Sequence, residues 1–148
     1  EFLDCLPNAV IVEDRYLMVH GGISSEIKST NDLVNSNDTK LEDILWSDPW
    51  DSEGEAKNDV RRAGKYFGPN ITNDVLQNLG VKVLIRGHEC YDKGYDIKHD
   101  GKVLTIFSAK NPDDYKDKVS NGAYLLIDDL SKEVQNAQEL EKGCIKQF

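Results

Sequence analysis

Apolar residues in this chain are grouped in short runs that alternate with polar, turn-forming residues. Ala9–Val12 and Tyr16–Val19 are separated by a short polar stretch, and this arrangement predicts a β-hairpin. Tyr95–Lys98 and Lys102–Phe107 flank the turn sequence His99-Asp100-Gly101 and predict a second hairpin. Two further apolar runs predict buried strands, Val81–Ile85 and Ala123–Ile127. The pattern therefore predicts a fold that contains several short strands.

Helical spacing of apolar residues is clearest in Pro69–Leu79, and Gly80 follows as a signal that ends the helix. A short helix is expected near Thr30–Val34. A further short apolar element, Leu41–Trp46, is expected to end before Asp48-Pro49, because the residue before proline avoids the helical region.

The remaining segments are less regular. The polar segment 24–40 is expected to be mostly loop, and the acidic segment 50–57 is expected to be exposed. Segment 131–148 fits either a helix or an edge strand. Trp46 and Trp50 are expected to be packing residues. Without internal repeats or linkers, residues 1–148 are expected to form a single, mostly β domain with short helices.

Composition and charge narrow the classes of protein to consider. The formal net charge of −9 argues against a nucleic-acid binder with a general basic surface, although local arginines or metals can still bind a phosphorylated substrate. No apolar run approaches the roughly 20 residues that cross a bilayer, so no membrane partner is expected. Cys5, Cys90 and Cys144 form no CxxC pair, which argues against structural zinc and favours a reducing cytoplasmic or nuclear setting.

Two of the three histidines stand at the ends of strand-like runs, each beside glycine. His20 follows the run 16–19, and His88 follows the run 81–85 after Arg86-Gly87. An imidazole at a strand end with adjacent glycine is a common way to build a metal site, so the two side chains could share one metal. Each could instead be a hydrogen-bonded structural residue. His99 stands in a turn and is expected to be solvated.

Arginines near these histidines are candidate phosphate contacts, because the planar guanidinium binds phosphate oxygens in pairs. Arg61 and Arg62 precede a loop with two glycines, and the alternative for them is a solvated pair that faces the acidic segment 51–55. Arg86 could pair with a nearby carboxylate. Glu89 could be this ion-pair partner of Arg86 or, equally, a catalytic acid.

Six short motifs occur along the chain in an order that is typical of one enzyme family. They are Leu6-Pro7-Asn8-Ala9-Val10-Ile11-Val12, Val19-His20-Gly21-Gly22-Ile23-Ser24, Leu45-Trp46-Ser47-Asp48-Pro49, Arg61 with Tyr66-Phe67-Gly68-Pro69, Leu84-Ile85-Arg86-Gly87-His88-Glu89, and Thr105-Ile106-Phe107-Ser108-Ala109 with Asn111. From Phe2 to about Ile127 the chain resembles the C-terminal half of the catalytic domain of metal-dependent serine/threonine phosphoprotein phosphatases, in the calcineurin-like metallophosphoesterase superfamily.

The resemblance implies a fold and roles for particular residues. The fold would be α/β, half of a metallophosphoesterase β-sandwich flanked by helices, mostly the C-terminal sheet. His20 and His88 would bind the same metal of a two-metal centre of manganese, iron or zinc, and Arg61 would clamp phosphate. Asp48 would lie near the substrate cleft and order it, while Arg86 would brace the His88 loop. The substrate would be a phosphoprotein.

Three motifs of that family, GDxHG, GDxxDRG and GNHE, do not occur in this sequence. They carry the other metal ligands, the general acid histidine and a second phosphate arginine. Two protein ligands are too few for a catalytic two-metal site, so the chain is expected to be the C-terminal part of one catalytic domain without its N-terminal half, and to be inactive alone. The missing half or a regulatory subunit would be its partner.

Two local departures from the family pattern affect the site. After Ala109, direct alignment places Pro112 where the family has a tyrosine that overhangs the active site, and Tyr115 takes that role only if the loop carries an insertion. Arg62 stands where many relatives have glycine, which leaves Arg62 as an alternative to Arg61 for the phosphate clamp. The segment 87–103 is most similar to the branch with EF-hand modules, although the chain has no EF-hand loop.

Two other functions remain open at this point. A different metallophosphoesterase, such as a dinucleoside polyphosphate hydrolase, shares motifs like those around His20 and His88. A phosphatase-like binding module without catalysis is the second alternative. The motif around Asp48 favours the protein phosphatase over the first, and the retained Arg61 argues against the second.

Overall fold

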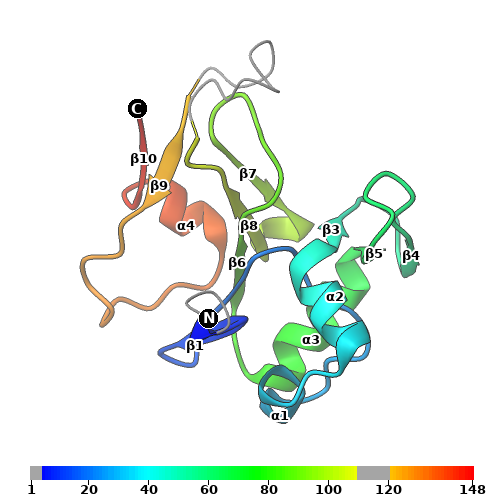
Figure 1. Cartoon of the computed structure of the whole chain (residues 1–148). Helices are drawn as coiled ribbons and strands as arrows, with labels where there is room; N and C mark the ends of the chain where they lie inside the picture. The colour runs from blue at the N-terminus through cyan, green and yellow to red at the C-terminus, as the bar shows by residue number, and fades with distance from the viewer. Residues whose placement is uncertain (1–4, 110–120) are drawn as a thin grey trace.

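The computed structural model describes residues 5–109 and 121–148, and within them a five-stranded sheet forms the centre of the fold (Figure 1). Its strand order is β1-β2-β6-β8-β7. The strands are β1 (Ala9–Val12), β2 (Tyr16–Val19), β6 (Val83–Arg86), β8 (Val103–Ile106) and β7 (Tyr95–Lys98). β1 and β2 pair antiparallel, as do β7 and β8, so both predicted hairpins are confirmed and lie at the two edges of the sheet.

The middle of the sheet is parallel. β6 lies between β2 and β8 and pairs parallel with both, with Met18 opposite Ile85 and Arg86 opposite Thr105. β6 begins at Val83 and ends at Arg86, slightly later than the predicted run. All four of its residues are buried, because both faces of the central strand are covered.

Alternate residues of the central strands face two separate apolar cores. Leu17 and Leu84 point to one face, where they pack with residues of two helices, α2 (Asp38–Trp46) and α3 (Pro69–Leu79). Tyr16 and Val83 point to the other face, against Ala137 and Leu140 of α4 (Ala137–Glu141). The helices therefore cover both faces of the sheet, as Figure 1 shows.

The helices begin and end largely where the sequence predicts. α3 has Pro69 in its first turn and ends at Gly80, whose φ of 70° is the left-handed conformation that glycine favours. α1 (Thr30–Val34) is present as expected. α2 begins at Asp38, earlier than the predicted apolar element, because Asn37 caps it by accepting a hydrogen bond from Lys40 N.

A small three-stranded sheet lies beside α2 and carries part of the candidate site. Its order is β3-β5-β4, formed by Asp48–Pro49, Lys65–Phe67 and Glu55–Lys57. The expectation that segment 50–57 is exposed holds for residues 51–53 and Lys57, whereas Trp50 and residues 54–56 are half-buried, and β4 pairs antiparallel with β5. Trp50 is a packing residue that stacks on Tyr66 with ring centroids 5.5 Å apart.

The C-terminal segment contains both of the elements that its sequence allows, α4 and the strand β10 (Ile145–Gln147), which pairs with β9 (Ala123–Leu125). The strand expected over 123–127 is present as the shorter β9, but it is only partly buried, since Tyr124 is 47% exposed, and Leu126 just beyond its end is 52% exposed. This two-stranded sheet buries only one of its faces. Within the described residues, no helix has the length and apolar character needed to cross a membrane.

His99 is buried rather than solvated, which corrects the prediction from its turn sequence. It lies in a short 3-10 turn (His99–Gly101) and is 8% exposed. Its Nε2 donates to the Trp50 carbonyl at 2.8 Å, and its Nδ1 lies 2.7 Å from Thr72 Oγ1. Burial lowers the pKa of His99 below its usual value. The prediction failed because Thr72 of α3 and Trp50 supply polar partners from distant parts of the sequence.

Candidate metal centre

His20 and His88 lie side by side at one edge of the central sheet. They follow β2 and β6, which are parallel neighbours, so the carboxyl ends of both strands reach the same edge. The two ring centroids are 5.1 Å apart with an interplanar angle of 68°. Gly87 N donates to His20 O at 3.0 Å, which fixes the two strand ends to each other. The convergence expected from the sequence is thus what the structure shows.

The histidine rings differ in their surroundings but both favour the neutral form. The His88 side chain is 8% exposed, and its Nε2 is buried without a hydrogen-bond partner. Burial and the Arg61 guanidinium lower the pKa of His88 to about 4. His20 is more exposed, and its pKa is lowered by desolvation, Arg86 and Arg61. Neutral imidazole is the form that binds metal, and a buried, unpartnered Nε2 suits a metal ligand.

Two ligands do not complete a metal site. The described residues contain no cluster of three or more His, Cys, Asp or Glu side chains that could hold a metal ion. The Asp48 carboxylate lies close to His88, with Oδ1 4.0 Å from Nε2. The residues present therefore fit part of a metal centre, with two imidazoles on one side of it.

Asp48, at the start of β3, is held by three donors. Oδ2 accepts from Asn58 Nδ2 at 2.9 Å and from Arg61 Nε at 3.0 Å, and Oδ1 accepts from Arg86 Nη2 at 2.8 Å. Although burial opposes it, the guanidiniums of Arg86 and Arg61 hold the pKa of Asp48 below its usual value. The carboxylate of Asp48 is thus ionised, and both of its oxygens already accept hydrogen bonds. It is therefore suited to hold its neighbours in position rather than to transfer a proton.

Arg61 bonds to residues of the site, whereas Arg62 is exposed. Besides its bond to Asp48, Arg61 donates from Nη2 to the His88 carbonyl at 3.2 Å, and its side chain is 26% exposed. Arg62 is exposed and adopts a φ of 60°. The alternative of a solvated pair facing residues 51–55 therefore does not describe Arg61.

Asn58 is a residue of the site that the sequence did not identify. It is fully buried, donates to Asp48, and accepts from Arg61 N at 3.1 Å. It therefore fixes both the carboxylate and the backbone that carries the arginine. Its position three residues before Arg61 is typical of an asparagine that bonds to a nearby backbone N–H, and this is the signal that could have found it.

Close backbone packing holds the histidine loop against the end of α2. A Cβ atom on Gly21 would lie 2.3 Å from the Leu45 carbonyl carbon, and one on Gly64 would lie 2.6 Å from the corresponding atom of Trp46. Trp46 is 43% exposed, and its ring meets His88 edge-on with centroids 5.5 Å apart. Glycine is therefore needed beside His20 so that Trp46 can approach His88.

Arg86 is the last residue of β6. It forms ion pairs with the carboxylates of Asp48 and Glu89, which is one of the roles that the sequence allowed for it. It is 2% exposed and donates to Asp48 and, through Nη1, to Glu89 Oε2 at 2.8 Å. Tyr91 Oη also donates to Glu89 Oε2, at 3.3 Å. Burial raises the pKa of Glu89, and Arg86 opposes that shift.

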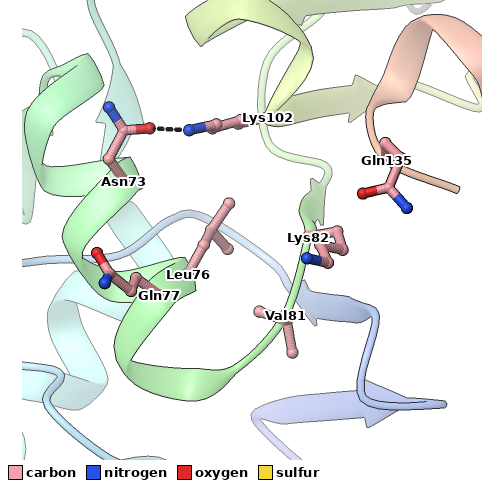
Figure 2. Close-up of a pocket in the computed structure, with 7 residues that line it drawn as sticks. All are labelled: Asn73, Leu76, Gln77, Val81, Lys82, Lys102 and Gln135. Carbon is pink, nitrogen blue, oxygen red and sulfur yellow. Dashed lines mark hydrogen bonds between the residues drawn. The ribbon is translucent and has the colours of Figure 1, made fainter.

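Two pockets lie at different ends of the parallel strands. One of about 640 Å³ borders His20 and is walled mainly by apolar residues, among them Leu6, Met18 and Leu45. The other, of about 380 Å³, lies at the opposite end, where Lys82 and Lys102 precede β6 and β8 (Figure 2). The first pocket belongs to the candidate site. The second is remote from the histidines.

The predictions for Asn111, Pro112 and Tyr115 concern positions outside the described residues. The same holds for Phe2, where the sequence resemblance begins.

Comparison with known proteins defines the class. The sequence profile of the calcineurin-like phosphoesterases matches residues 1–92, and the chain belongs to this family. Membership in this metallophosphoesterase family implies divalent metal ions at the site. The family resemblance and the α/β fold expected from the sequence are both confirmed.

Particular relatives are serine/threonine-protein phosphatases. Human serine/threonine-protein phosphatase with EF-hands 1 is 44% identical over 108 residues, which cover 73% of this chain and 16% of the relative. Serine/threonine-protein phosphatase rdgC of Drosophila melanogaster is 34% identical over 145 residues, covering 82% of this chain and 21% of the relative. The chain thus spans about a sixth to a fifth of these proteins.

A solved structure shares the fold. It is a protein serine/threonine phosphatase from Saccharomyces cerevisiae, described as similar to human phosphatase PP5, with 27% identity and a TM-score of 0.75. The match covers 97% of this chain and 47% of that structure.

Proposed function

We propose that this chain supplies one side of a two-metal centre in a serine/threonine protein phosphatase. His20 and His88 bind one metal, and Arg61 binds the phosphoryl group. The observation that carries the proposal is the 5.1 Å separation of the two imidazoles, with Arg61 bonded to the His88 carbonyl. The names of the relatives support a protein phosphatase as the activity of the whole protein.

Each residue then has a role that follows from its contacts. Metal ions in such a centre act as Lewis acids toward phosphoryl oxygens and activate water for in-line attack. Arg61 orients the phosphate with its guanidinium, which Asp48 and the His88 carbonyl hold in place. Asp48 stays ionised and positions Arg61, so it acts through that arginine. Trp46 excludes water from one edge of His88.

The remaining ligands come from outside these 148 residues under this proposal. Two histidines cannot complete a two-metal site, and the pocket beside His20 offers room for further protein groups. The related yeast structure contains about twice the length of chain matched here, which is consistent with a centre built from two parts of one domain. The metals proposed are manganese, iron or zinc, because imidazole suits iron and zinc, and oxygen ligands from the remaining part of the centre would suit manganese.

The proposed substrates are phosphoserine and phosphothreonine in proteins, and the proposed setting is the cytoplasm or nucleus. Relatives named for EF-hands suggest a regulated enzyme, with a regulatory subunit or further domain as partner. Calcium regulation would require a segment beyond this chain, which contains no EF-hand loop.

The test compares three substrates in one assay. A protein that carries this chain together with the remaining family motifs is incubated with manganese and a phosphoserine peptide, a phosphothreonine peptide or diadenosine tetraphosphate. The proposal expects hydrolysis of the two peptides, loss of that activity in His88→Asn, and no turnover by the 148-residue chain alone. Preferred hydrolysis of the dinucleotide would assign the other metallophosphoesterase function, and no turnover of any substrate would favour a binding module.

A further inference from the structure

Arg86 is a buried charge that contacts three separate segments around the candidate centre. Its side chain is fully buried, and its backbone is fixed within β6 between β2 and β8. Nε donates to the Gly21 carbonyl, directly after His20, and Nη2 donates to Ser47 O at 3.3 Å as well as to Asp48. Nη1 reaches Glu89, directly after His88.

From this geometry we propose that Arg86 is the positioning residue that sets the spacing of His20 and His88 and the direction of Arg61. The inference rests on the proposed function, because it concerns how the same centre is assembled. Arg86 acts through other residues and is assigned no contact with substrate or metal.

The first step of the argument concerns the two histidines. β2 and β6 pair as far as Met18 and Ile85, one residue before the end of each strand, and His20 and His88 stand beyond that pairing. His88 adopts a φ of 69°, so its loop leaves the strand direction at this point. In addition to the Gly87 N to His20 O bond, the Arg86 guanidinium joins the loop after His20 to the loop after His88.

The second step concerns Arg61. Oδ1 of Asp48 receives Arg86 and Oδ2 receives Arg61, so the carboxylate transmits the position of one guanidinium to the other. The Ser47 carbonyl fixes the backbone just before Asp48 to the same Arg86 nitrogen. A change at Arg86 therefore reaches the phosphate contact without touching it.

The third step concerns residue type. Guanidinium is planar, with donors fixed in several directions, and Arg86 uses Nε, Nη1 and Nη2 on different partners. A lysine ammonium is a single point on a flexible stem and cannot reach the Gly21 carbonyl, Asp48 and Glu89 together. Arg86→Lys thus keeps the positive charge but removes the simultaneous hydrogen bonds to the Gly21 carbonyl, Asp48 and Glu89.

The experiment measures zinc binding by the 148-residue chain through the ring nitrogens of its histidines. Long-range ¹⁵N–¹H NMR spectra are recorded during a Zn²⁺ titration of the wild type, Arg86→Lys and the control Arg15→Lys. Arg15 is a matched control because it also bridges two backbone carbonyls, those of Leu130 and Lys132, away from the histidines. Circular dichroism and thermal unfolding show whether each variant is folded.

In the wild type, the His20 and His88 signals are expected to shift together with one midpoint. In Arg86→Lys, the midpoint is expected to rise at least about tenfold and the two histidines to titrate separately, as expected when a residue that orients metal ligands is lost. Arg15→Lys should match the wild type. Joint binding at the wild-type midpoint in a folded Arg86→Lys variant would overturn the proposal.

Glu89→Gln keeps the test decisive if Arg86→Lys does not fold. It removes the charge of one Arg86 partner but keeps a side-chain oxygen that can accept from Arg86 Nη1, and it leaves the contacts to the Gly21 carbonyl, the Ser47 carbonyl and Asp48 in place. Joint zinc binding within about twofold of the wild type is expected. Separate titration of His20 and His88 in Glu89→Gln would overturn the proposal. The charge of Glu89, rather than the hydrogen bonds of Arg86 to several loops, would then set the spacing of the two histidines. If His20 and His88 of the wild type do not bind zinc jointly, the result contradicts the proposed function, in which the two histidines share one metal.

Discussion

Arg61 Nε donates to Asp48 Oδ2 over 3.0 Å, and this bond directs the arginine side chain toward the loop of His88. Asp48 is only 6% exposed on its side chain and also holds Arg86. The carboxylate therefore joins the partly exposed Arg61 to the buried Arg86 within the candidate site. Its substitution should affect both catalysis and stability.

Asp48→Asn tests this joint role. In the complete enzyme we expect kcat/KM for a phosphopeptide to fall by roughly 100-fold, because Arg61 is no longer held in one orientation. In the 148-residue chain we expect the free energy of unfolding to fall by about 3 kcal/mol, since Arg86 loses a buried charge partner. Steady-state kinetics and urea unfolding measure the two effects. Unchanged kinetics in the folded variant would show that Arg61 does not depend on Asp48.

Arg61 and Arg62 provide a matched pair for the phosphate contact. Arg61→Ala is expected to lower kcat/KM by about 100-fold or more, because a donor to the transition state is lost. Arg62→Ala should leave activity within about twofold of the wild type, since Arg62 is exposed. Inhibition by inorganic phosphate, measured for both variants, reports the loss of binding directly. A larger effect in Arg62→Ala would reverse the assignment.

Gly21→Ala tests the close approach of the histidine loop to α2. The added Cβ would stand 2.3 Å from the backbone of Leu45, so one of the two segments must move. We expect a loss of about 1–3 kcal/mol in the free energy of unfolding. Gly143→Ala is the control, because a Cβ there meets nothing within 4 Å. Equal stability of both variants, measured by urea unfolding, would contradict the close packing.

His99 should make the stability of the fold depend on pH. Burial keeps its pKa below the value near 6.5 of an exposed histidine, so the unfolded chain binds a proton that the folded chain does not. The contribution is present above about pH 6.5 and is lost as pH falls toward the lower pKa of the folded state, by up to about 1.4 kcal/mol per pH unit. Urea unfolding between pH 5 and 7.5 measures this slope. It should be shallower in His99→Gln, and equal slopes would contradict the role of His99.

Most of the fold could be predicted because its signals are local. The hairpin over β1 and β2 and the helix Pro69–Leu79 occur at the predicted residues. The hairpin turn and the glycine end signal each act within a few neighbouring residues, so a single sequence contains them. The strand β4 and the burial of His99 could not be read in this way, since their partners are Lys65–Phe67, Thr72 and Trp50.

The candidate site divides in the same way. Its histidines and Arg61 carry a recognisable chemistry in short motifs, whereas Asn58 was missed because its importance lies in a buried bond to Asp48. The position of Arg86 three residues before Glu89 suggested an ion pair, but the contacts to Gly21 and Ser47 join residues far apart in the chain.

By itself, the sequence determined the strands of the central sheet, the main helix and the residue types suited to a metal and a phosphate. Local backbone preferences and side-chain chemistry suffice for these. Only the tertiary structure decided that His20 and His88 face each other, that Arg61 rather than Arg62 enters the site, and that Arg86 spans three loops. The physical reason is that strand pairing and burial bring distant residues together, and a buried charge is stable only where several such partners meet.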